Sequence, residues 1–227
     1  MMRLPCALLI CHSLIASSAL ADATCRDGSF VSMRVVDGGS VQMGVAGSIT
    51  NPQRIARVTT FCMDAAEMTV ERYESCVNGG KCSALPLQCT PARGRTFPIA
   101  CLTWDDAQLA CGFEGKRLPS QDEWEFAARG LTMATVPRAF IRSPANASVH
   151  FANPGLHVTM GDPSDIAGNH LFDMAGNMSE WTSTVYQTDV VIRGGSYLAP
   201  STLLLATRVL PRATVAVDIG VRCARTI

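Results

Sequence analysis

The sequence predicts an α+β domain with little regular secondary structure. Short segments with helix-start signals lie between residues 69 and 130, and the other apolar runs are short and separated by turns rich in glycine, proline and asparagine. The 227 residues contain no internal repeat, heptad pattern or low-complexity tract. Short helices mixed with many short strands are typical of α+β domains with abundant loops.

The first 21 residues are expected to be a signal peptide that is removed on export. Arg3 provides a short positive start, an apolar stretch follows, and Ala19-Leu20-Ala21 has the spacing of a cleavage site. A membrane anchor is the alternative, but Pro5 and several serines make this stretch a poor spanning helix. We therefore expect residues 22–227 to form one exported domain, periplasmic or secreted, with no membrane span after cleavage.

Charge and composition exclude some classes of partner. The 19 Lys and Arg side chains are balanced by 19 Asp and Glu side chains, and neither sign clusters along the chain. Because nucleic acids and anionic membrane surfaces attract clustered positive charge, we expect neither of them as a partner.

Cysteine usage indicates disulfide bonds. Ten cysteines are present, two of them in the expected signal peptide. The other eight are Cys25, Cys62, Cys76, Cys82, Cys89, Cys101, Cys111 and Cys223. An even number in an exported chain favours disulfides, and the absence of any Cys-x-x-Cys pair disfavours zinc. Spacing alone does not choose among the many possible pairings.

The N-terminal part after the signal peptide is expected to consist of strands. Residues 30–36 and 41–44 are predicted to pair as a hairpin around the Asp37-Gly38-Gly39 turn. Residues 57–64 are rich in valine and threonine and are predicted to form one further strand. Near the other end of the chain, residues 220–224 are predicted to form a closing strand.

The first predicted helix begins after Thr69, whose hydroxyl can cap it, and ends at Asn78-Gly79-Gly80. Residues 81–98, with several cysteines and prolines, are expected to form an irregular loop held by disulfides.

Two further helices carry capping-box signals. In such a box a hydroxyl and an acidic side chain three residues apart each accept a hydrogen bond from the other's backbone N–H. The two pairs are Thr103 with Asp106 and Ser120 with Glu123. Each helix also carries a tryptophan at helical spacing, and Trp104 and Trp124 are expected to pack in the core.

The stretch from Leu171 to Trp181 holds two carboxylates, Asp173 and Glu180, on either side of Gly176-Asn177. Glycine and asparagine tolerate a positive φ, so a turn at this pair would fold Asp173 back toward Glu180. Converging oxygen atoms of this kind suit calcium. The alternative is that both carboxylates only accept hydrogen bonds from nearby backbone N–H groups, and spacing alone favours this alternative.

A second distinctive stretch runs from Val190 to Tyr197. It is predicted to be a strand that ends at Gly194-Gly195, where a sharp bend or a close backbone approach is expected. Ser196 follows the bend and is a weak candidate for a reactive group, because no histidine and carboxylate pattern marks it as a nucleophile. A tightly packed turn is the favoured interpretation. The histidines His150, His157 and His170 have no helical metal spacing, so no metal site is expected from them.

Taken together, the motifs resemble the family of sulfatase-modifying factors, also known as formylglycine-generating enzymes. They run in family order across most of residues 22–227, and the ordered set is far more specific than any one motif. The matching stretches are residues 38–44, 61–70, 103–107, 116–130 (Lys-Arg-Leu-Pro-Ser-Gln-Asp-Glu-Trp-Glu-Phe-Ala-Ala-Arg-Gly), 171–181, 193–197 (Arg-Gly-Gly-Ser-Tyr) and 220–224 (Gly-Val-Arg-Cys-Ala).

The resemblance implies a C-type-lectin-like fold, with short helices around small antiparallel sheets. In the family's oxidase members, two cysteines just after Arg-Gly-Gly-Ser bind Cu(I), and oxygen then converts a substrate cysteine to formylglycine. Paired soft thiolates suit Cu(I). Residues 196–208 of this chain contain no cysteine, so copper is not expected even though the family's serine is retained as Ser196.

The family also has a calcium motif that matches residues 173–180. Carried over to this chain, the ligands are the side chains of Asp173 and Glu180 and the backbone carbonyls of Gly176 and Met178. The resemblance therefore implies a structural calcium ion.

Two disulfides are expected. The family links the cysteine of the first tryptophan helix to the cysteine of the Gly-x-Arg-Cys motif, which implies a bond between Cys111 and Cys223. Cys76 and Cys82 are expected to form a second, local pair.

Two functional hypotheses follow. The first is an exported, non-oxidase module that binds or scaffolds an unknown protein or peptide ligand. The second is a formylglycine-generating or related peptide-modifying oxidase with a metal site rebuilt from other residues. The missing cysteine pair favours the first hypothesis, and copper-dependent oxygen uptake with a cysteine peptide would discriminate between the two.

Overall fold

A computed structural model describes residues 25, 33–86, 94–129, 170–174, 176–198 and 207–227. The expected signal peptide, Cys89 and the segment from residue 130 to 169 lie outside the described residues. Within the described part of the chain, no helix is both long and apolar enough to cross a membrane.

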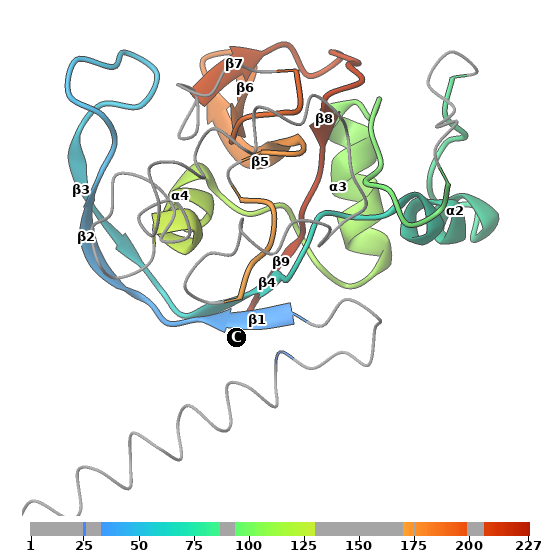
Figure 1. The fold of residues 1–227 in the computed structure, drawn as a ribbon, viewed down its shortest axis with the longest axis horizontal. Helices are drawn as coiled ribbons and strands as arrows, with labels where there is room; N and C mark the ends of the chain where they lie inside the picture. Colours follow the sequence, from blue (N-terminus) through green and yellow to red (C-terminus); the bar gives the residue numbers. More distant parts are fainter. Residues whose placement is uncertain (1–24, 26–32, 87–93, 130–169, 175, 199–206) are drawn as a thin grey trace, which may run out of the picture.

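The described elements form small sheets and short helices (Figure 1). The strands are β1 (Met33–Val36), β2 (Gly39–Met43), β3 (Arg54–Val58), β4 (Phe61–Asp64), β5 (Ser179–Tyr186), β6 (Asp189–Arg193), β7 (Thr207–Leu210), β8 (Ile219–Gly220) and β9 (Ala224–Thr226). The helices are α2 (Val70–Asn78), α3 (Trp104–Phe113) and α4 (Gln121–Arg129). This composition confirms the α+β prediction.

The N-terminal strands form one long antiparallel ribbon, which corrects the predicted hairpin. β1 pairs with β4 and β2 pairs with β3, so β1 and β2 do not pair with each other. Val36 faces Phe61 and Gly39 faces Val58, which means that the same register continues from one pair into the other. A Cβ at Gly38 would lie 2.4 Å from the carbonyl oxygen of Val58. Gly38 therefore permits a close backbone approach inside the ribbon rather than a turn at its end.

The C-terminal part builds a four-stranded sheet in the order β7-β6-β5-β8, in which β5 and β8 run parallel. The predicted closing strand over residues 220–224 is split. Its start belongs to β8 in this sheet, whereas Ala224 begins β9, which pairs with β4 in the other sheet. The stretch between them thus connects the two sheets.

The helix starts agree with the predicted caps. Thr69 accepts a hydrogen bond from the Arg72 backbone N–H at the start of α2. Thr103 and Asp106 form both bonds of a capping box at α3. The pair Ser120 and Glu123 does the same at α4.

Each tryptophan helix supports its own part of the core. Trp104 of α3 packs with Tyr73 of α2 and with Trp181 of β5. Trp124 of α4 packs with Met43 and other apolar side chains of the ribbon. Figure 1 shows α4 between the β2–β3 ribbon and the four-stranded sheet, which places the residues after β6 next to this helix.

Candidate functional site

The stretch from Leu171 to Glu180 lies in the interior. Asp173 is 1% exposed and Glu180 is fully buried. Asn177 has a φ of 57°, as expected for the predicted turn. Asp173 also has a positive φ, 58°, which the spacing of glycine and asparagine does not predict. The left-handed backbone at both positions confirms a strongly curved loop that leads into β5.

Glu67, in the loop between β4 and α2, holds this curved segment. One carboxylate oxygen accepts a hydrogen bond from the Asn177 side-chain amide at 2.8 Å, and the other accepts from the Met178 backbone N–H at 3.1 Å. Burial raises the pKa of Glu67 well above its ordinary value, and the nearby carboxylates of Asp173 and Glu180 raise it further. Glu67 is thus the third member of a buried acidic group.

Arg222 is the cation of this group. Its guanidinium donates to Glu180 at 2.9–3.2 Å, and it also donates to the backbone carbonyls of Asp64 and Phe172. Trp124 Nε1 donates to Glu180 at 2.6 Å. Burial alone would lower the pKa of Arg222, but Glu180 beside it holds the pKa above its ordinary value. Glu180 therefore has side-chain donors, which rules out, for this residue, the interpretation that only backbone N–H groups bind it.

The donor chemistry of the loop fits a calcium ion. Glu67, Asp173 and Glu180 surround one guanidinium, that of Arg222, so carboxyl groups outnumber the cation in this buried group. A divalent cation would offset the excess, and calcium accepts carboxylate and backbone carbonyl oxygens together. Gly176 and Met178, whose carbonyls complete the predicted ligand set, are buried on the same loop.

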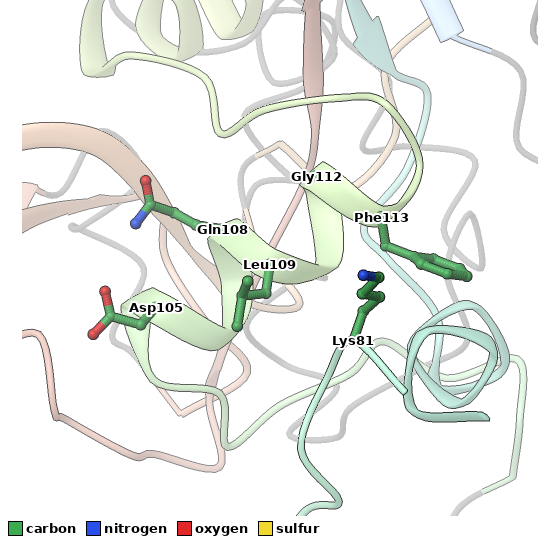
Figure 2. Close-up of a pocket in the computed structure, with 6 residues that line it drawn as sticks. All are labelled: Lys81, Asp105, Gln108, Leu109, Gly112 and Phe113. Carbon is green, nitrogen blue, oxygen red and sulfur yellow. The ribbon is translucent and has the colours of Figure 1, made fainter. Parts of the chain in front are cut away.

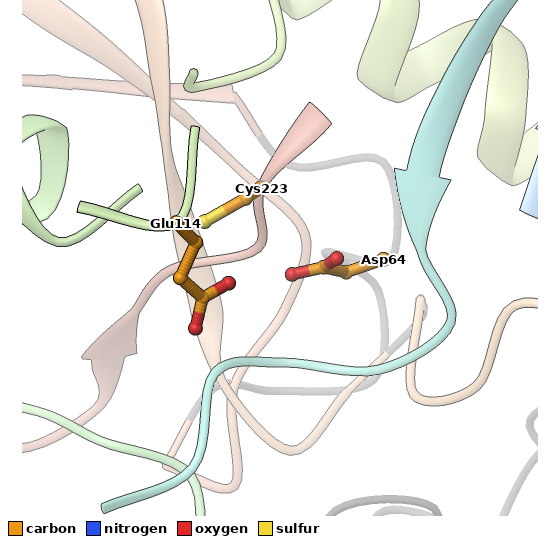
Figure 3. A group of neighbouring side chains, drawn as sticks. All are labelled: Asp64, Glu114 and Cys223. Carbon is orange, nitrogen blue, oxygen red and sulfur yellow. The ribbon is translucent and has the colours of Figure 1, made fainter. Parts of the chain in front are cut away.

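A second acidic group does not form a metal site. Asp64, Glu114 and Cys223 bring three potential ligand atoms within 4.8 Å of one another, as no other set of three does in the described part of the chain (Figure 3). Lys116 Nζ lies 2.9 Å from Asp64 and 3.0 Å from Glu114, and Arg72 contacts the same two carboxylates. The Cys223 sulfur belongs to a disulfide. Two cations already neutralise the two carboxylates, so we infer no metal here.

Glu125 of α4 joins three parts of the fold. Its carboxylate accepts from Arg193 at 2.6 Å, from Arg129 at 2.7 Å, from the Gly44 backbone N–H at 2.8 Å and from the Asn51 amide at 2.9 Å. Burial alone would raise the pKa of Glu125, but Arg193 and the other donors lower it overall. Burial lowers the pKa of Arg193 to about 10. This network fixes the end of β6, from which the Gly194–Ser196 turn begins.

The predicted bend after β6 is confirmed. Gly194 has a φ of 82°, and a Cβ there would lie 3.1 Å from the Trp124 ring, so both conformation and space favour glycine. Ser196 is 1% exposed. Its hydroxyl donates to Asp218 at 2.8 Å and accepts from the Leu198 backbone N–H at 3.3 Å. These bonds suit a packed turn, and a reactive role for Ser196 stays a prediction.

The cysteines are engaged in disulfides. Cys111 is bonded to Cys223 and Cys76 to Cys82, as expected. Cys25 is bonded to Cys62, a pairing that the sequence did not choose. Cys101 is also disulfide-bonded. Among the eight cysteines after the expected signal peptide, only Cys89 lies outside the described residues.

Comparison with known proteins agrees with this architecture. The family model of the sulfatase-modifying factor enzyme 1-like domain matches residues 17–227. The chain belongs to this family. Membership of the sulfatase-modifying factor family explains why the motifs from the N-terminal ribbon to β9 follow one another in the family's order.

Two relatives in the family represent different functions. An inactive C-alpha-formylglycine-generating enzyme 2 from Bos taurus is 35% identical over 119 residues, which cover 45% of this chain and 39% of the relative. A formylglycine-generating enzyme from Streptomyces coelicolor is 30% identical over 163 residues, 56% of this chain and 52% of the relative. The matches thus span about two fifths to one half of these relatives' lengths.

A solved structure supports the fold. PvdO from Pseudomonas aeruginosa superposes with a TM-score of 0.72 at 18% sequence identity, covering 86% of this chain and 94% of that one. Together with the small sheets and short helices, this similarity confirms the formylglycine-generating-enzyme fold, the C-type-lectin-like fold that the family resemblance implied.

Sequence reasoning missed the buried charged residues that hold the predicted loop and the bend after β6. Glu67, Glu125 and Arg222 are all fully buried and come from segments far from residues 173–180. Glu67, Glu125 and Arg222 each lie in a stretch that carried the family resemblance, and a charged residue inside an otherwise apolar motif was the available signal.

Proposed function

We propose that this chain is an exported, non-oxidase binding domain of the sulfatase-modifying factor family. The state of its cysteines carries the proposal. After Arg193-Gly-Gly-Ser196 the sequence holds a single cysteine, Cys223, and that residue is bonded to Cys111. A Cu(I) centre of the family's oxidase type needs two thiolates close together.

An oxidase with a rebuilt metal site is the competing hypothesis. Seven of the eight cysteines after the expected signal peptide are disulfide-bonded, so no pair of free thiolates is left among them. A rebuilt site would therefore depend on nitrogen and oxygen ligands, which suit Cu(I) less well than sulfur does. The group of Asp64, Glu114 and Cys223 is occupied by cations and a disulfide, and it offers no replacement.

Similarity to a relative that is named inactive supports a role without this oxidation. The family fold can present binding surfaces independently of that chemistry, because function depends on particular sites and not on the fold itself. The expected ligand is a protein or a peptide of an exported partner.

A structural calcium ion is part of the proposal. Asp173 and Glu180, with the carbonyls of Gly176 and Met178, would hold it. The ion would supply positive charge to a buried group that is rich in carboxylates. It would stabilise the loop beside the Arg193–Tyr197 segment, since the Tyr197 backbone N–H donates to the Asn177 carbonyl at 2.9 Å.

Export is proposed from the N-terminal 21 residues and from the disulfides. Disulfides form and persist in oxidising compartments such as the periplasm or the extracellular space.

Anaerobic Cu(I) titration against a competing chelator tests the proposal. We expect the unreduced protein to take no Cu(I) from the chelator. A formylglycine-generating enzyme with its cysteine pair serves as the positive control. One tightly bound Cu(I) per unreduced chain would contradict the proposal.

A further inference from the structure

A groove lies between α3 and the turn that follows α2 (Figure 2). We call it the α3 groove, and it is lined by Lys81, Asp105, Gln108, Leu109, Gly112 and Phe113. Its volume is about 580 Å³. Figure 2 shows Lys81 beside Leu109 and Phe113, while Asp105 and Gln108 project at the opposite end of the helix. The groove thus has a basic end, an apolar middle and an acidic end.

Both walls of the groove are rigidly held. The turn that carries Lys81 is closed by the disulfide between Cys76 and Cys82, and the Lys81 backbone N–H donates to the Cys76 carbonyl at 3.1 Å. The other wall, α3, is fixed to the core by the bond from Cys111 to Cys223. A preformed groove loses little conformational entropy when a ligand binds.

The floor of the groove contains a glycine that the fold does not require. Gly112 lies within α3, where glycine is less favourable than alanine. A Cβ added at Gly112 would meet nothing within 4 Å, so packing does not exclude a side chain there. Any larger residue would instead project into the α3 groove between Leu109 and Phe113. The glycine therefore keeps open a space that folding leaves unused.

The apolar and charged groups of the groove are available for binding. Leu109 is 51% exposed and Phe113 is 42% exposed. Lys81 and Asp105 form no ion pair with any residue in the described part of the chain. The groove therefore offers one free cation and one free anion on either side of an apolar surface.

We propose that the α3 groove binds a short extended peptide segment of a partner protein, with an acidic residue at Lys81 and a basic residue at Asp105. One or two apolar side chains of the segment lie between them, on Leu109 and Phe113. This inference rests on the proposed function, because it names the ligand class of the proposed binding domain. Charge complementarity at the two ends fixes the ligand's chemistry, and the apolar middle supplies contact area.

The dimensions of the groove set the length of the segment. Asp105 and Gly112 are seven residues apart on α3, which corresponds to about 10 Å along a helix. An extended chain advances about 3.3 Å per residue. The groove therefore accommodates three to four residues, and the two charged side chains are separated by one or two apolar residues.

The probe is a pool of terminally blocked tetrapeptides with Glu and Lys at the two ends in either order and Leu, Val or Phe at the two middle positions. Nitrogen-15 NMR titration of the full exported chain follows binding through the backbone amides. We expect the amides of Lys81 and Gly112 to shift. A pool of the same composition, with both charges in the middle, is the control and should bind more weakly.

Three variants locate the binding. Gly112→Leu fills the groove and should weaken binding at least tenfold, whereas Gly112→Ala keeps the helix intact as a folding control. Loss of a surface ion pair weakens binding about two- to fivefold. Lys81→Glu also places a negative charge beside the acidic residue of the peptide, so it should weaken binding by more than this. A pool with Lys at both ends should restore binding to Lys81→Glu. Arg57→Glu, on the exposed face of β3, is the matched charge control and should bind like the wild type.

Three results would overturn the inference. The first is equal binding of the pool to the wild type, Lys81→Glu and Gly112→Leu. The second is no binding to the wild type at millimolar peptide. The third is a dimer, seen by sedimentation, that Gly112→Leu dissociates, because a second copy would then be the occupant. None of these results bears on the oxidase question. Formylglycine production is measured separately and would overturn the proposed function whatever the groove binds.

Discussion

Replacement of Glu125 by glutamine is expected to destabilise the fold strongly. The Glu125 carboxylate is fully buried and neutralises Arg193, which is also fully buried. Glu125→Gln keeps the size of the side chain but leaves the guanidinium of Arg193 without its anion. Breaking a buried pair in this way costs about 3–5 kcal/mol. For a domain of this size, that free energy corresponds to a fall in Tm of about 6–20 °C.

The measurement is thermal and urea unfolding of unreduced protein. Glu71→Gln is the matched control, since Glu71 pairs with Arg95 at the surface and both side chains are more than half exposed. The control should change the free energy of unfolding by less than about 1 kcal/mol. The double variant Glu125→Gln/Arg193→Met should recover part of the loss, because it removes the fully buried unpaired charge, while Arg129 stays without its anion. A loss below 1 kcal/mol for Glu125→Gln, or a double variant no more stable than the single one, would refute this explanation.

Three further predictions follow from the same structure. Calcium at one hundred times its dissociation constant should stabilise the wild type by about 2.7 kcal/mol, which raises Tm by about 5–11 °C relative to the protein in chelator. Asp173→Ala should abolish this difference. An equal Tm of the wild type in calcium and in chelator would show that no calcium stabilises the fold. Replacing Cys111 and Cys223 by alanine should cost about 2–5 kcal/mol in urea unfolding, because the bond closes a sequence separation of 112 residues; an unchanged midpoint would argue against a native bond. Burial alone would raise the pKa of Glu114, but Arg72 and then Lys116 lower it overall. The ionised Glu114 therefore stabilises the fold fully above its unfolded pKa of about 4.3, and this stabilisation is lost as pH falls through the folded pKa. Glu114→Gln should reduce the loss of stability at acid pH, and the same acid dependence in variant and wild type would contradict the ion pairs.

The parts of the fold that depend on local chemistry were predictable. Thr103 with Asp106, and Ser120 with Glu123, satisfy backbone groups within their own helices, so four consecutive residues contain the whole signal. The bend at Gly194 was predictable for the same reason.

Strand pairing was harder to predict from the sequence, because it depends on segments that are far apart along the chain. Asp37-Gly38-Gly39 has the composition of a hairpin turn, but Gly38 instead lets the backbone near Val58 approach closely. The ribbon continues past it to a loop in residues 44–53, which contains the turn dipeptide Asn51-Pro52. The turn rule therefore picked out Gly38 correctly as a position that needs glycine but assigned it to a hairpin turn instead of a close backbone approach.

The candidate site was predictable only in part. The loop from Asp173 to Glu180 and its curvature follow from its own sequence. Its buried partners, Glu67 and Arg222, are more than a hundred residues and about forty residues away along the chain, and only the folded chain brings them together. The α3 groove likewise combines residues of α3 with Lys81, and no motif marks it.

Mass spectrometry of a sulfatase-type cysteine peptide, incubated with the unreduced protein, Cu(I) and oxygen, tests the central claim most directly. Conversion of the cysteine to formylglycine replaces the thiol by an aldehyde, which a hydrazine probe captures. A formylglycine-generating enzyme is the positive control, and a reaction without protein is the blank. The account predicts no aldehyde above the blank. Aldehyde that accumulates in proportion to the protein and requires copper would contradict it.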